Sequence, residues 1–157
     1  MFEVIMYLFE SYMQIDSEYE LDPESITTEL INEGFKDFEI ASALSWLDNL
    51  SKIHNQDPSI KMQAAQSTSL RIYCDREESV ISLECQGYIL YLEQAKILTP
   101  YSREIIIDCI MSLDVKELTL DDLQWLILMV LHNDPNSKSE FTQLESMLLD
   151  IEYGLIH

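Results

Sequence analysis

The chain has 157 residues, which fits one domain or two small domains that share a core. Its residues are 47% hydrophobic and 24% charged, with only three Gly and four Pro, and this composition excludes disordered and low-complexity classes. Nine Lys and Arg against 29 Asp and Glu give a formal net charge of −20. A chain this acidic repels the phosphate backbone of nucleic acids, so we expect no direct binding to DNA.

The first fifteen residues are mostly apolar, but they do not have the pattern of an export signal. Glu3 and Glu10 interrupt them, and the first basic residue of the chain is Lys36. The other long apolar run, 126–131, is far shorter than the roughly 18 residues that cross a bilayer. Three isolated cysteines are expected to be small buried hydrophobic residues: Cys74, Cys85 and Cys109. We therefore expect a cytoplasmic protein with no membrane partner.

Apolar periodicity and helix-capping residues predict a mostly α chain. In chain order, Asp22 before Pro23 starts a helix that Gly34 ends, and Thr99 before Pro100 starts a later one. Three further pairs have the spacing of capping boxes, namely Asp75 with Glu78, Thr119 with Asp122, and Ser137 with Glu140. The predicted helices cover 2–14, 23–33, 37–52, 76–97, 100–113, 120–132 and 138–150.

The region 54–73 has a different pattern. Turn-forming residues at 55–59 precede apolar residues with extended spacing, which predicts a short β-hairpin or an ordered loop near 60–73. Helices followed by such a hairpin are the order of elements in a winged helix-turn-helix. We therefore expect a winged-helix-like N-terminal half, 1–74, packed on a C-terminal helical bundle, 75–157, with one shared core.

Three of the predicted helices carry more apolar surface than one buried stripe requires: the first helix, the helix over 76–97 and the helix near 120–132. Gly87 lies in the middle of the helix over 76–97, and the close approach of a neighbouring helix would explain a glycine there. Core packing and a subunit contact both remain open for all three. In the first helix, four residues are candidates for an interface: Phe2, Tyr7, Leu8 and Tyr12.

No motif for catalysis stands out. The chain has no clustered glycines for a phosphate loop, no nucleophile elbow, and no His or Cys set at metal-ligand spacing. We expect no metal and no cofactor. Arg71 and Arg103 are the best candidates for specific polar roles, either as structural ion pairs or as ligands of an anion, and Tyr73 shares a strand face with Arg71. These three residues are the candidate ligand-binding site.

The helix near 37–52 corresponds to the DNA-reading helix of a winged helix. Asp37, Glu39 and Asp48 accompany Lys36 and Lys52 there, whereas a DNA-reading helix carries mainly Arg, Lys, Asn or Gln. If the winged-helix fold is present, its use in reading DNA is therefore not expected.

Eight segments of the sequence carry a family resemblance: 1–10, 34–35, 43–47, 71–73, 87–94, 103–104, 121–131 and 154–157. Through these segments the whole chain resembles the bacterial Smg family, a family of unknown function. Genes of that family lie near genes for DNA processing and for translation initiation, which is an association without a mechanism. The resemblance implies no catalytic residue.

Two functional hypotheses follow. The first is a non-enzymatic, acidic cytoplasmic adaptor that binds a basic protein surface or associates with itself. The second is a small enzyme or nucleic-acid factor, acting in DNA processing or translation, with a site around Arg71, Tyr73 and Arg103. An enclosed pocket joining these three residues favours the second hypothesis, and an apolar patch rimmed by acids favours the first.

Overall fold

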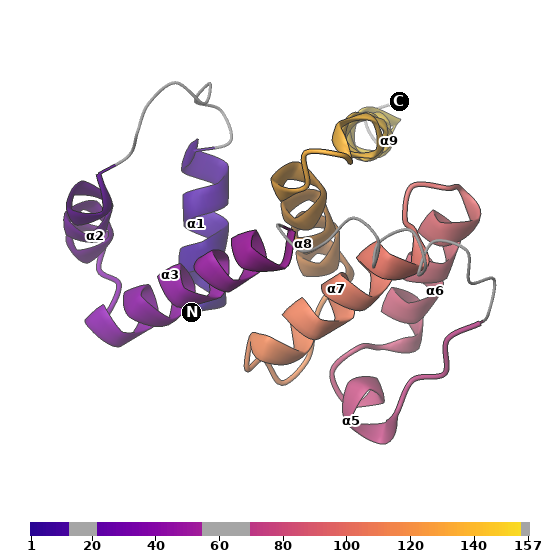
Figure 1. Ribbon diagram of the computed structural model, residues 1–157, viewed down its shortest axis with the longest axis horizontal. Coiled ribbons are helices and arrows are strands. Elements are labelled where there is room, and N and C mark those ends of the chain that lie inside the picture. The colour runs from indigo at the N-terminus through magenta and orange to yellow at the C-terminus, as the bar shows by residue number, and fades with distance from the viewer. Residues whose placement is uncertain (13–21, 55–69, 155–157) are drawn as a thin grey trace. The chain divides into compact units, whose positions relative to one another are not determined.

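The computed structural model describes residues 1–12, 22–54 and 70–154 (Figure 1). Eight helices and no strand occur in these ranges, which confirms the mostly α class. The chain divides into two compact units, Met1–Lys52 and Ile53–His157. This division comes earlier than the expected boundary after residue 74. The shared core and that boundary stay predictions.

The first unit contains α1 (Phe2–Tyr12), α2 (Pro23–Asn32) and α3 (Asp37–His54). Tyr7 of α1 donates a hydrogen bond to Glu29 of α2 over 3.1 Å, and its ring lies edge-on to Phe35 with 5.7 Å between centroids. The N-terminal amine lies 3.8 Å from a carboxylate oxygen of Glu39 on α3. One tyrosine and one terminal charge thus connect α1 to both following helices.

The ends of α2 follow the local chemistry of the sequence. Asp22 accepts a hydrogen bond from the backbone N–H of Glu24, and Pro23 occupies the first turn. Gly34 has a φ of +97°, the left-handed conformation expected of a glycine that ends a helix. Helices α2 and α3 are therefore separate and joined by a short turn, as predicted.

The wing of the expected winged helix is not confirmed. Residues 70–73 form no strand, and residues 60–69 lie outside the described residues. The winged-helix-like character of the N-terminal half stays a prediction.

The second unit contains five described helices: α5 (Asp75–Glu78), α6 (Leu83–Gln94), α7 (Pro100–Ser112), α8 (Leu120–Asn133) and α9 (Lys138–Gly154). Helix α8 packs against α6, α7 and α9, and α6 also packs against α7. In Figure 1, α8 lies beside α7 in the second unit, and α9, the next helix in the chain, also lies beside α8. Thr99 and Thr119 cap α7 and α8 as predicted, each accepting a hydrogen bond from a backbone N–H three residues later. Helix α8 is the centre of this unit.

The single predicted helix over 76–97 is wrong, because the chain forms α5 and α6 with a break between them. The carbonyl of Val80 accepts a hydrogen bond from the N–H of Leu118, so this part of the backbone pairs with a distant segment. Ser82 then caps α6 by accepting from the N–H of Cys85. The cap of α5 is Cys74, one residue before the predicted Asp75.

Two further expectations are corrected in the second unit. Cys74 is exposed, whereas Cys85 and Cys109 are buried as predicted. Gly87 has no described neighbour close by, because a Cβ placed on it would meet nothing within 4 Å. The expected close approach of a neighbouring helix at Gly87 is therefore wrong for the described residues.

None of the helices in the described ranges is long and apolar enough to span a bilayer. The expected cytoplasmic location stays a prediction.

Candidate functional site

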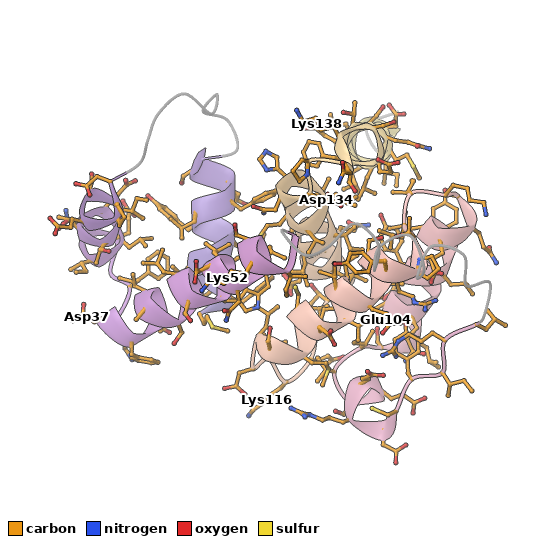
Figure 2. The ribbon with its side chains drawn as sticks, in the orientation of Figure 1. Asp37, Lys52, Glu104, Lys116, Asp134 and Lys138 are labelled. Carbon is orange, nitrogen blue, oxygen red and sulfur yellow. The ribbon has the colours of Figure 1, made fainter. Side chains whose placement is uncertain are left out.

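The structure brings Arg71, Tyr73 and Arg103 into one cluster. Arg71 and Tyr73 lie in the extended segment before α5, and Arg103 lies in the first turn of α7. Both guanidinium groups donate to the same carboxylate, that of Glu104, which is labelled in Figure 2. The two arginines chosen from the sequence thus share a partner, although 32 positions separate them in the chain.

Arg71 contacts two carboxylates from two helices. Its NH1 and NH2 groups donate to the two oxygens of Glu77 over 2.6 and 2.7 Å, a bidentate pair. Its Nε donates to Glu104 over 2.8 and 3.0 Å. Glu77 also accepts from the backbone N–H of Cys74 over 3.1 Å, at the start of α5. Arg71 therefore fixes the extended segment to α5 and to α7 at once.

Arg103 forms the deeper half of the cluster, with only 8% of its side chain exposed. Its NH1 group donates to both oxygens of Glu93, on α6, over 3.1 and 3.2 Å. Its Nε and NH2 groups each lie 3.0 Å from Glu104. Glu104 is 44% exposed, so it closes the cluster on the solvent side.

The hydrogen bonds between Arg71 and Glu77 shift the pKa of both groups toward their charged forms. The bonds from Arg71 lower the pKa of Glu77 to about 2, and the bonds to Glu77 raise the pKa of Arg71. Partial desolvation, with Glu104 as a like charge, raises the pKa of Asp108 one turn later on α7. Glu77 and Arg71 are therefore both ionised at neutral pH.

Tyr73 completes the cluster with its ring. The guanidinium carbon of Arg71 lies 5.0 Å from the ring centroid, within the range of a cation–π contact. Burial is the main cause that raises the pKa of the Tyr73 hydroxyl, so it stays protonated at neutral pH. Residues 70–73 form no strand, so the predicted strand face of Arg71 and Tyr73 is not formed, although the two side chains are in contact.

Three carboxylates surround two guanidinium groups, so the cluster carries an excess of negative charge. An anionic ligand would have to displace one of these carboxylates from an arginine, and Glu104 is the most exposed of them. The arrangement holds the extended segment, α5, α6 and α7 together, which is the structural ion-pair role that the sequence left open. A ligand-binding role for the three residues stays a prediction.

The carboxylate partners were only partly visible in the sequence. Glu104 follows Arg103 directly and could be named as a neighbour, whereas Glu77 reads as an ordinary first-turn acid of α5 and Glu93 carries no signal. Pairing Arg103 with Glu93 requires knowing that the end of α6 lies beside the start of α7. Within the described ranges, no group of three or more His, Cys, Asp or Glu side chains is arranged to hold a metal ion.

The four interface candidates of α1 have different surroundings. Leu8 is buried, Phe2 is partly exposed, and Tyr7 contacts Glu29 and Phe35 of its own unit. The side chain of Tyr12 lies outside the described residues. The interface stays a prediction, with Phe2 and Tyr7 partly exposed.

Fold and site together define a mostly helical, strongly acidic protein with an ion-pair cluster in its second unit. The family model described as "Protein of unknown function (DUF494)" matches residues 1–157. The chain therefore belongs to this family, as the resemblance implied. No solved structure matches it.

Curated relatives cover the whole chain. It is 42% identical to a Smg homolog of Vibrio atlanticus, with 100% of this chain and 99% of the relative covered. It is 41% identical to a Smg homolog of Aliivibrio fischeri and 40% identical to one of Aeromonas hydrophila, with both chains fully covered in each case. The names of these relatives state no activity.

Proposed function

We propose that the protein is a non-enzymatic adaptor that binds a basic surface of another protein. The observation that carries this proposal is the distribution of charge in the first unit. Residues 1–35 contain no Lys or Arg, and every acidic residue described in that range is exposed: Glu3, Glu10, Asp22, Glu24, Glu29 and Glu33. Exposed carboxylates attract a basic partner and speed its encounter.

The same charge argues against a DNA-binding use of the helix–turn–helix. Asp37, Glu39 and Asp48 lie on α3, and Lys52 is already paired with Asp48 over 2.6 Å. A winged-helix-like half with this helix is better suited to a basic protein than to phosphates. Self-association is the weaker form of the adaptor hypothesis, because two copies with net charges of −20 repel each other.

The alternative function places a ligand at Arg71, Tyr73 and Arg103. The bidentate pair of Arg71 with Glu77 and the bonds from Arg103 to Glu93 support a structural role for both arginines, so an added anion meets guanidinium groups that already have partners. The two functions differ in a simple measurement. An anionic ligand is lost on Arg71→Met, whereas binding of a basic protein does not require Arg71.

The test is affinity purification of the full chain from native bacterial cytoplasm, followed by binding measurements with each purified candidate. We expect a partner with a basic surface, whose affinity falls steeply as NaCl rises from about 0.05 to about 0.5 M, because salt screens exposed charges. Recovery of only neutral or acidic proteins, or a salt-independent affinity, would contradict the proposal.

A pair of charge variants sharpens this test. Glu24→Gln with Glu33→Gln removes two exposed charges of the first unit and is expected to weaken binding severalfold, mainly through the association rate. Glu117→Gln with Asp150→Asn removes two exposed charges of the second unit and is the matched control. Equal effects of the two pairs would mean that net charge matters and the position of the acids does not.

A further inference from the structure

Helix α6 has an exposed side that carries no charged residue. Leu83 is 82% exposed, Leu90 is 39% exposed and Tyr91 is 50% exposed, and Gly87 is exposed between them. These residues recur at intervals of three and four, so they share one side of the helix, and we call them the α6 apolar face. Three residues of the opposite side are buried: Cys85, Ile89 and Leu92.

Exposed apolar side chains are common singly, but this face is contiguous along the helix. Its members span most of α6, whose 12 residues correspond to about 18 Å of helix at about 1.5 Å per residue. Contiguous apolar surface on a protein surface is typical of an interaction site. The α6 apolar face is therefore a candidate docking surface for an element about three turns long.

Gly87 indicates what kind of element fits. A glycine inside a helix is unfavourable by about 1 kcal/mol relative to alanine, and here no described part of the chain uses the space above it. The absence of a Cβ at the centre of the face lets another backbone approach closely, with Leu83 and Tyr91 on either side along the helix. A second helix that crosses at Gly87 can approach where the Cβ is missing and can contact Leu83 and Tyr91 on either side of the crossing point.

Charge decides between the possible partners. From residue 77 to residue 95 the sequence contains no Lys or Arg, and Glu84 is exposed at the margin of the face. A second copy of the chain would bring the same helix, without Lys or Arg, against another of its kind. An anionic membrane would meet the same repulsion. A helix with apolar residues on one side and Lys or Arg at its margins complements both the face and the exposed Glu84 beside it.

We propose that the α6 apolar face binds an amphipathic helix of another protein, with its apolar side over Gly87 and its basic residues at the acidic margin. This inference rests on the proposed function and adds a contact surface on the second unit, which is distinct from the exposed acids of the first unit, and the chemistry of the partner segment. The partner helix contacts Leu83, Leu90 and Tyr91, and the Gly87 backbone lies at the crossing point.

The first experiment maps the contact in cells. A photoreactive benzoylphenylalanine replaces Leu83 or Tyr91 in the full chain, and cross-linked peptides are identified by mass spectrometry. The control is the same group at Leu149, an exposed leucine of α9. The expected product joins positions 83 and 91 to a Lys- and Arg-rich amphipathic segment of another protein, with little product from position 149. Cross-links to a second copy, to an acidic segment, or equally from position 149 would overturn the proposal, as would their absence.

The second experiment uses a synthetic peptide of the cross-linked segment and full-length variants. Gly87→Ala adds one methyl group where the partner backbone approaches, and we expect it to weaken binding about tenfold while the variant stays folded by circular dichroism. Leu83→Ser removes an apolar contact at an exposed position and is expected to have a similar effect. Leu149→Ser is the control and is expected to change the affinity less than about twofold.

The outcomes separate this inference from the proposed function. If the wild-type chain binds a basic partner with salt-dependent affinity but Gly87→Ala and Leu83→Ser bind it as tightly, the α6 apolar face is not the docking surface and the adaptor function stands. If the wild-type chain binds no basic partner at all, both proposals fail.

Discussion

Helices α6 and α8 have similarly apolar sequences and opposite surroundings. Helix α8 packs against three other helices, and it buries Leu123 and the whole run 126–131. Helix α6 buries one side against α7 and α8 and leaves Leu83, Leu90 and Tyr91 exposed on the other. An apolar pattern thus tells how much surface a helix has to cover, but it does not tell which side the chain itself covers.

The largest expected effect comes from truncating a buried side chain of α8. Leu126→Ala in α8 removes a side chain with 0% exposure, and we expect a loss of about 2 to 5 kcal/mol in the free energy of unfolding because a cavity remains. Leu83→Ala in α6 is the control, with an expected change of less than about 0.5 kcal/mol at an exposed position. Urea denaturation followed by circular dichroism measures both. Similar losses for the two variants would remove the contrast between the helices.

The next effect concerns the ion-pair cluster around Arg71 and Arg103. Arg103→Met keeps most of the apolar stem but leaves Glu93 and Glu104 without their shared cation. We expect a loss of about 2 kcal/mol, less than the range of fully buried pairs, because Glu104 is partly exposed. Arg76→Met, at an exposed arginine of α5, is the control and should be close to neutral. A neutral Arg103→Met would mean that the cluster does not hold its four segments together.

Local signals predicted much of the fold, and long-range pairing limited the rest. Asp22, Thr99 and Thr119 cap their helices because a cap depends on neighbours within three residues. The break between α5 and α6 was missed because it involves a bond from Leu118 to Val80, and no window of sequence contains both.

The candidate site follows the same division. The chain has only three arginines, and the apolar neighbours of Arg71 and the Glu104 that follows Arg103 at a helix start were enough to choose these two. Their partners Glu77 and Glu93 could not be assigned, because each arginine meets its carboxylate only after α5, α6 and α7 are placed. The open side of α6 was missed for the same reason, since exposure depends on which helices pack beside it.

The cluster also makes a prediction for acid stability. The pKa of Glu77 is lowered from 4.5 to about 2, so its contribution is fully present above pH 4.5 and is lost as the pH falls through 2. Glu77→Gln is expected to be less stable than wild type by about 1 kcal/mol at neutral pH, a value discounted for solvent screening. The difference should shrink as the pH approaches 2. A difference that is constant over this range would assign the effect to packing and not to the Arg71–Glu77 charges.

The smallest expected effect tests the open side of α6 directly. Gly87→Ala is expected to raise the free energy of unfolding by about 0.5 to 1 kcal/mol, because alanine is the better helix former and its Cβ meets nothing within 4 Å. Gly34→Ala is the opposite control, since its φ of +97° makes any Cβ unfavourable by about 1 to 2 kcal/mol. Urea midpoints of the two variants should therefore move in opposite directions. If Gly87→Ala destabilises the chain instead, part of the chain itself covers Gly87, α6 is enclosed as α8 is, and no side of it remains for a partner.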